Sequence, residues 1–187
     1  MMPADYSCSD ADIDVIRGQI GREHIFASGI LDRCAYGYPR IILLDPDAGG
    51  GEWNYEAVSN VLWLTCPYLN ERIHRLEQDG YIEKIGEFIN SDISVAMKME
   101  SAHAHMYFFR KRVCKIAPGM TVPEEIRRVM DAGVGGGRDT RSLKCLHAQF
   151  CHYRVCADNV AGMMATRLLD NRINCDEVRC RNAVERY

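Results

Sequence analysis

Long hydrophobic runs are missing from this chain of 187 residues. No stretch approaches the ~18 uninterrupted apolar residues that a membrane-spanning helix requires, so a membrane is not an expected partner. The first sixteen residues, MMPADYSCSDADIDVI, contain neither a basic segment nor an apolar one, which argues against a secretory signal. Together these absences predict a cytoplasmic protein.

A strong net charge is also lacking. The chain has 23 basic and 26 acidic residues and a formal charge of -3, whereas dedicated nucleic-acid-binding proteins usually carry a positive excess. Nucleic acid is therefore not an expected partner. There is no internal repeat and no low-complexity tract, and a content of 47% hydrophobic and 26% charged residues is ordinary for a globular chain. We expect a single domain over residues 1–187.

The strand signals lie in the N-terminal third. HIFASGILDRC, PRIILLDP and VLWLTCP are apolar runs bounded by turn residues such as Gly37 and Pro39. Short connections between them favour antiparallel pairing. Helical periodicity precedes them at 10–23 and follows them at 67–89 with a break at Gly80, 93–114, 121–133, 144–156 and 159–171. The prediction is an α+β fold in which a small, mostly antiparallel sheet is covered by several helices from the C-terminal two thirds.

Nine cysteines give the clearest chemical signal. An odd number in a reducing compartment does not suggest a disulfide framework, so buried hydrophobic residues, metal ligands or reactive thiols remain. The densest segment is SLKCLHAQFCHYRVC at 142–156. If 144–156 is helical, Cys145, His152 and Cys156 share one face, whereas His147 and Cys151 lie on another.

One helix cannot supply a whole metal site. A closed zinc site takes four Cys or His ligands, and an iron–sulfur cluster takes mostly thiolates. Cys34 and Cys66 each end a predicted strand, where sites are commonly built, although a cysteine there is also often simply packed. His103 and His105 are two residues apart, so at most one joins a given site. The remaining cysteines have no telling context, including the pair in CDEVRC, and we expect them to be structural: Cys8, Cys114, Cys175 and Cys180.

Several segments resemble, in order and spacing, a bacterial family, the domain-of-unknown-function family numbered 501. They are RGQIGREHIFASGILDRCAYGYPRIILL, VLWLTCP, RLEQDGYI, an Ala-His before an aromatic pair and RKR, and KCLHAQFCH. The resemblance covers about residues 17–155 and leaves a C-terminal helix and polar tail, 159–187, outside. It implies no reaction. It implies that three cysteines and up to three histidines belong together, namely Cys34, Cys66, Cys145, His105, His147 and His152.

Such a set admits several chemistries. Three thiols and a histidine would complete a zinc site, whereas three thiols alone could hold an iron–sulfur cluster with one iron open to substrate. Without a metal, Arg33 and Lys144, each adjacent to a cysteine, could activate a thiol. The loop GVGGGRDTR, with Arg138, Arg141 and Lys144, either holds a small anionic substrate or is a flexible connector. We predict an iron–sulfur or zinc protein and assign no catalytic residue.

A non-catalytic module is the alternative class. It would be either a zinc-stabilised interaction domain or a winged-helix DNA-binding regulator. The segment ERIHRLEQDGYIEKI resembles a recognition helix followed by a strand. Its basic residues are balanced by Glu71, Glu77 and Asp79, which argues against a DNA-facing helix.

Overall fold

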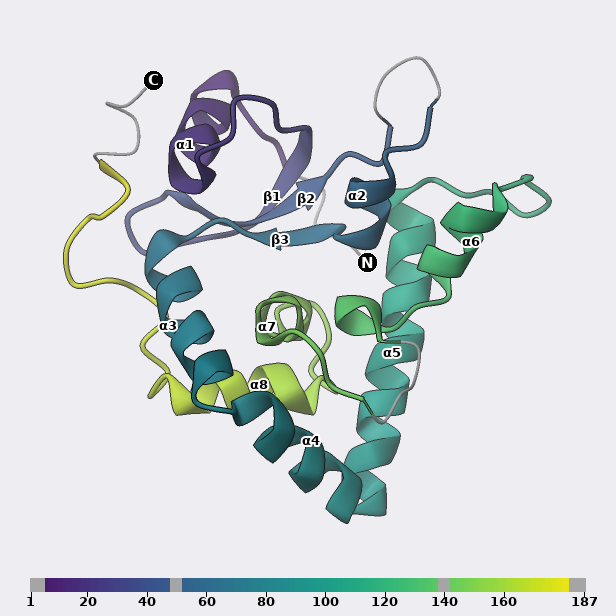
Figure 1. The fold of residues 1–187 in the computed structure, drawn as a ribbon. Helices are drawn as coiled ribbons and strands as arrows, with labels where there is room; N and C mark the ends of the chain where they lie inside the picture. Colours follow the sequence, from purple (N-terminus) through teal and green to yellow (C-terminus); the bar gives the residue numbers. More distant parts are fainter. Residues whose placement is uncertain (1–5, 48–51, 138–141, 182–187) are drawn as a thin grey trace.

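The computed structural model describes residues 6–47, 52–137 and 142–181. In this part of the chain, a three-stranded sheet has helix α1 on one face and most of the other helices on the opposite face (Figure 1). The α+β prediction is confirmed. In chain order the elements are α1 (Asp10–Ile20), β1 (Ala27–Arg33), β2 (Pro39–Leu44), α2 (Tyr55–Ser59), β3 (Leu62–Leu64), α3 (Pro67–Gln78), α4 (Tyr81–Ser91), α5 (Ile93–Val113), α6 (Glu124–Met130), the 3₁₀ turn η1 (Val134–Gly136), α7 (Leu146–Tyr153) and α8 (Val160–Leu168).

The sheet is an antiparallel meander in the order β1-β2-β3. Its central strand β2 is buried along its whole length. Because side chains alternate between the two faces of a strand, Ile41 and Leu43 pack into the large core beneath the sheet, while Ile42 and Leu44 pack with Ile16 of α1. The apolar run in PRIILLDP thus contributes side chains to the hydrophobic cores on both faces of the sheet.

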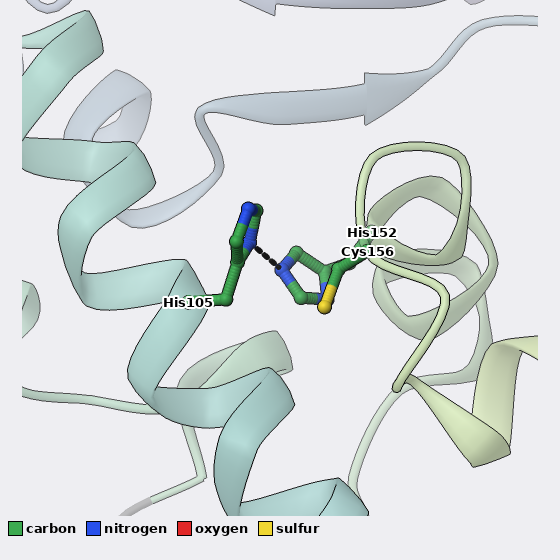
Figure 2. Close-up of side chains that lie close together, drawn as sticks. All are labelled: His105, His152 and Cys156. Atoms are coloured by element: carbon green, nitrogen blue, oxygen red, sulfur yellow. Dashed lines mark hydrogen bonds between the residues drawn. The ribbon is translucent and has the colours of Figure 1, made fainter. Parts of the chain in front are cut away.

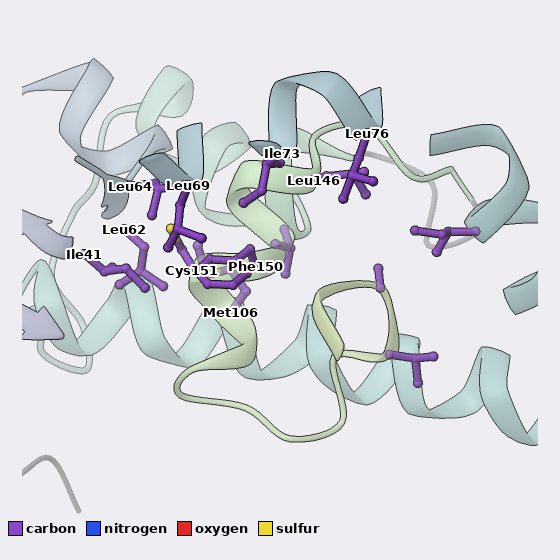
Figure 3. Close-up of a cluster of buried hydrophobic side chains, with 14 of the residues drawn as sticks. Ile41, Leu62, Leu64, Leu69, Ile73, Leu76, Met106, Leu146, Phe150 and Cys151 are labelled. Carbon is purple, nitrogen blue, oxygen red and sulfur yellow. The ribbon is translucent and has the colours of Figure 1, made fainter. Parts of the chain in front are cut away.

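Helix α7 lies in the middle of the helical layer. Leu146 and Phe150 are fully buried, and Figure 3 shows them among side chains of α3 and Met106 of α5. Helix α8 approaches α7 so closely that a Cβ atom on Gly162 would lie 2.2 Å from the carbonyl oxygen of Gln149. Glycine at position 162 therefore allows the close packing of these two helices.

Two of the sequence-predicted cysteines precede helices. Cys66 is the N-cap of α3 and is followed by Pro67 in the first helical position, where a missing backbone N–H has no cost. Cys145 is the N-cap of α7 and has extended backbone torsions. The sequence predicts a helix over 144–156, but α7 spans only Leu146–Tyr153. Cys145 consequently lies outside the helical face on which the periodicity places it.

The segment after Gly80 excludes the winged-helix alternative. Gly80 adopts a positive φ of 75°, and the chain then continues directly as helix α4, whereas a winged helix requires a strand at this point. In the described part of the chain, none of the helices combines the length and the apolar character that crossing a membrane requires.

Candidate metal centre

Three potential ligands meet where α3 ends and α7 begins. Glu77 lies in the last turn of α3, Cys145 directly precedes α7, and His147 lies in the first turn of α7. One ligand atom from each, the carboxylate oxygen, Sγ and Nδ1, lies within 4.8 Å of the other two. The backbone N–H of Leu146 donates to Glu77 Oε1 at 2.7 Å, so the same carboxylate ties the start of α7 to α3.

The spacing of these atoms suits a single tetrahedral zinc ion. With bonds of about 2.3 Å to sulfur and about 2.0–2.1 Å to nitrogen or oxygen, a tetrahedron puts sulfur and nitrogen about 3.5 Å apart, and nitrogen and oxygen about 3.3 Å apart. Cys145 Sγ lies 3.9 Å from His147 Nδ1, and His147 Nδ1 lies 3.2 Å from Glu77 Oε1. The first distance exceeds the tetrahedral value by about 0.4 Å, and the second agrees with it to about 0.1 Å.

The hydrogen bonds of His147 determine which ring nitrogen can bind a metal. Nε2 lies 3.2 Å from the carbonyl oxygen of Asn70, and because a carbonyl only accepts, Nε2 must carry the proton. Nδ1 is then the nitrogen that faces Cys145 and Glu77. A ligating histidine commonly donates its other N–H to a backbone carbonyl in this way.

Without a metal, His147 is a cation. Burial acts to lower its pKa, but contact with the Cys145 thiol, the negative charge of Glu77 and the Asn70 carbonyl outweigh burial and raise the pKa to about 9. At neutral pH the metal-free site therefore holds an imidazolium beside Glu77 and Cys145. A metal ion would replace the proton on Nδ1.

The site opens into a cavity of about 300 Å³. Cys145 and His147 lie on its wall, and Glu77 is half-buried behind them. The rest of the wall is apolar or uncharged, and among the described residues it offers no cationic side chain. Its other residues are Asn60, Leu62, Trp63, Leu64, Asn70, Ala148 and Cys151.

A second group, His105, His152 and Cys156, lies between α5 and the end of α7 (Figure 2). His105 Nδ1 lies 3.0 Å from His152 Nε2. Burial lowers the pKa of His152 to about 3, helped by positive charge at His105. Burial also lowers the pKa of His105. Both rings are therefore neutral at pH 7.

The hydrogen-bond chain around His152 leaves it unsuited to a metal. Asn159 Oδ1 accepts the N–H of Gly162 at 2.8 Å, which fixes the amide so that its Nδ2 is the donor to Gln149 Oε1 at 2.8 Å and to His152 Nδ1 at 3.0 Å. His152 Nδ1 is thus an acceptor, and Nε2 carries the proton that it donates to His105. A metal on Nε2 would need a proton on Nδ1, facing the amide hydrogens. We interpret this group as a structural network.

The structure divides four of the predicted ligands between two groups and leaves two cysteines outside both. Cys145 joins His147, whereas His105 joins His152, and Cys34 and Cys66 belong to neither group. Cys34 is half-buried directly after β1, and Cys66 is buried.

The cations predicted to bind an anion are also dispersed. Both terminal guanidinium nitrogens of Arg33 donate to Asp12, at 2.7 and 3.0 Å, so the charge of Arg33 is already compensated. Lys144 is exposed beside Cys145. Arg138 and Arg141 lie outside the described residues.

Glu77 is the candidate ligand that the sequence did not indicate. It lies almost seventy residues from Cys145 and is one of several acidic residues on a helix of mixed charge, so nothing in its local pattern distinguishes it. Only the packing of α7 against α3 brings it to the site. Cys156, by contrast, lies near His152, but α7 ends at Tyr153, so the turn after the helix brings the two residues together and not a shared helical face.

The comparisons with known proteins concern the same region of the chain. The model of a family described as protein of unknown function (DUF501) matches residues 30–167, a range that contains both His/Cys groups and ends before Cys175. No curated protein and no solved structure matches the chain significantly. The match covers well over half of the sequence and confirms the resemblance found in its motifs. The chain therefore belongs to the DUF501 family.

Proposed function

We propose that this protein binds one zinc ion through Glu77, Cys145 and His147 and leaves the fourth coordination position open to the cavity. The observation that carries the proposal is the contact between His147 Nε2 and the Asn70 carbonyl at 3.2 Å. It orients the ring so that the Nδ1 lone pair points between a thiol and a carboxylate. Three protein ligands with one open position are typical of catalytic zinc sites, whereas structural zinc sites are closed by four.

The donor set favours zinc over an iron–sulfur cluster at this place. A cluster takes mostly thiolate ligands, and this group has one thiol, one imidazole and one carboxylate. Zinc accepts all three ligand types. An iron–sulfur cluster, which the cysteine content of the sequence also allows, would need a different set of cysteines.

An open position beside a mostly uncharged cavity suits a small anionic ligand. Zinc bound there would supply a Lewis acid that attracts the anion and polarises it or a coordinated water. The protein itself orients His147 through Asn70, offers the amide of Asn60 on the cavity wall, and places exposed Lys144 beside the site. Small-molecule hydrolysis or a related Lewis-acid reaction is the class of activity that this arrangement supports.

Metal-free thiol chemistry is the second candidate, and one observation favours it. The protonated His147 ring lies 3.9 Å from Cys145 Sγ, and a nearby imidazolium stabilises a thiolate. Glu77 and Cys145 both face Nδ1, however, whereas a nucleophile and its orienting acid usually bind opposite ring nitrogens. The zinc proposal therefore fits the geometry better.

Elemental analysis of purified protein and four variants tests the proposal. Glu77→Gln, Cys145→Ser and His147→Gln should each lose about one zinc per chain relative to the wild type, because three ligands are too few to spare one. Glu77→Gln keeps an oxygen that can accept the Leu146 N–H. Cys156→Ser is the matched control, since it removes a neighbouring thiol that the proposal does not use, and it should keep the wild-type zinc content.

Unchanged zinc in all three site variants would refute the zinc proposal. The thiol candidate makes a separate prediction for metal-free protein. Alkylation by iodoacetamide, mapped by mass spectrometry, should then be faster at Cys145 in the wild type than in His147→Gln.

A further inference from the structure

The C-terminal segment after α8 returns to the sheet. Figure 1 shows it in yellow, passing α3 toward the turn between β1 and β2. The N–H of Ala35 in that turn donates to Asn174 Oδ1 at 2.9 Å. The hydroxyl of Tyr36 donates to the carbonyl oxygens of Cys175 and Asp176 at 3.2 and 3.1 Å. These bonds hold Cys175 beside the turn that begins at Cys34.

The same segment then reaches the start of α3. Arg179 pairs with Glu71 at 2.7 Å and stacks over the ring of Tyr68 at 5.3 Å, and both partners lie in the first two turns after Cys66. Gln19 Nε2 donates to Cys180 Sγ at 3.2 Å and also to the carbonyl of Pro39 at 2.8 Å.

That carbonyl links Cys180 to Cys66. The hydroxyl of Thr65, the residue before Cys66, donates to the same Pro39 oxygen at 3.2 Å. Cys180 and Cys66 are both buried, with 4% of each exposed. Two half-buried and two buried cysteines therefore lie around the end of the sheet at which β1 and β3 terminate.

The charges of these thiols affect one another. Burial raises the pKa of Cys66 to about 11, and negative charge at Cys180 and Cys175 adds to the increase. Burial likewise raises the pKa of Cys180, with contributions from charge at Cys34 and Cys175. Cys66 is thus affected by Cys175 and Cys180, and Cys180 also by Cys34, and buried thiols grouped in this way are costly to ionise unless a cation binds them.

We propose that Cys34, Cys66, Cys175 and Cys180 form a second, four-thiolate metal site that holds an iron–sulfur cluster or a zinc ion and fastens the C-terminal segment to the sheet. Both occupants are known to take four cysteines. The site is independent of the zinc site proposed above, because Cys66 and Glu77 lie at opposite ends of α3, about 16 Å apart along the helix axis.

The spacing of the sulfur atoms favours the cluster. Among the described residues, no three of these four sulfur atoms lie within 4.8 Å of one another. A single tetrahedral zinc ion would hold its sulfur ligands about 3.8 Å apart, whereas a cluster distributes its ligands over several irons.

The surroundings suit an anionic centre of this kind through hydrogen bonding rather than charge. Arg40 donates to the carbonyl of Ile173 at 3.0 Å, and Arg179 precedes Cys180 in the sequence, but Asp32 and Glu71 already compensate the charges of these two guanidinium groups. The Gln19 amide already donates to one sulfur, and hydrogen bonds of this type stabilise thiolates bound to iron.

Metal analysis of protein purified without oxygen tests the site. Iron, acid-labile sulfide and zinc would be measured for the wild type, Cys175→Ser, Cys180→Ser and the double variant, with Cys8→Ser as the control for loss of an unrelated thiol. We expect the double variant to lose either the iron and sulfide or one zinc, and Cys8→Ser to lose neither. Loss of iron and sulfide identifies a cluster, and loss of zinc alone identifies a mononuclear site.

A second measurement guards against misfolding and separates the two proposals. Hydrogen exchange of residues 171–181 should speed up in the double variant, while the amides of α7 keep their protection. His147→Gln should leave the metal of the four-thiolate site and its exchange pattern unchanged. The inference is overturned if the double variant retains the full metal content of the wild type.

Discussion

The network around Asn159 yields a quantitative prediction. Asn159→Ala removes the N-cap bond to Gly162 and leaves two buried acceptors, Gln149 Oε1 and His152 Nδ1, without their donor. Loss of an N-cap costs about 1 kcal/mol, and each buried acceptor left unsatisfied costs about 1–3 kcal/mol. We expect the free energy of unfolding to fall by about 3–7 kcal/mol.

Asn54→Ala is the matched control. Asn54 caps α2 through one bond to the N–H of Ala57 and has no comparable buried partners, so its loss should cost about 1 kcal/mol. Urea unfolding of metal-free protein, followed by circular dichroism, measures both. With a slope of about 2 kcal/mol per molar urea, the midpoint should fall by about 1.5–3.5 M for Asn159→Ala and by about 0.5 M for Asn54→Ala.

Equal shifts for the two variants would refute the reasoning, because Asn159 would then act only as a cap. Asn159→Asp provides a further check. It preserves an acceptor for the Gly162 N–H but donates nothing to Gln149 or His152, so it should remain destabilised well beyond Asn54→Ala. A variant as stable as the wild type would mean that the donor role of Asn159 is wrong, and His152 could then bind a metal.

Two further predictions concern stability. Gly162→Ala should destabilise the protein by about 1–3 kcal/mol, because the new Cβ would lie 2.2 Å from a backbone atom of α7. Gly86→Ala is the control: its Cβ would have its nearest neighbour at 3.9 Å, so this variant should stabilise α4 by up to about 1 kcal/mol. Thermal unfolding measures both changes. Hydrogen bonds from Arg33 hold the pKa of Asp12 well below its usual range, so their pair stabilises the fold above about pH 4 and loses this effect as the pH falls further. Because Arg33 is partly exposed, Asp12→Asn should lower the free energy of unfolding by about 1 kcal/mol at pH 7 and by progressively less in acid. Urea unfolding of the wild type and the variant at several pH values measures this difference. A difference in stability that grows as the pH falls would contradict the role given to the Asp12–Arg33 pair.

Local sequence patterns predicted the secondary structure well because each signal has a direct physical cause. The apolar run of PRIILLDP forms β2, which is buried on both faces. Gly80 separates α3 from α4 through a positive φ, and Pro67 begins α3. The start of α7 was predicted less well. Extending its periodicity to Lys144 placed Cys145 inside the helix, whereas Cys145 is the N-cap.

The site depends on contacts that periodicity does not encode. Placing Cys145 one residue before the helix turns its thiol toward His147, two residues on, although a continuous helix would separate them. Glu77 arrives from α3 through tertiary packing alone. Cys175 and Cys180 likewise make long-range contacts, with Tyr36 in the turn after β1 and with Gln19 of α1, so the spacing in CDEVRC does not by itself indicate a partner.

The most direct test of the zinc proposal is anomalous X-ray scattering at the zinc edge from crystals of zinc-loaded protein. We predict a peak bonded to Cys145 Sγ, His147 Nδ1 and a Glu77 oxygen, with His147 Nε2 still donating to the Asn70 carbonyl and a fourth ligand on the cavity side. A peak between His105 and His152, or none near Cys145, would contradict the proposal.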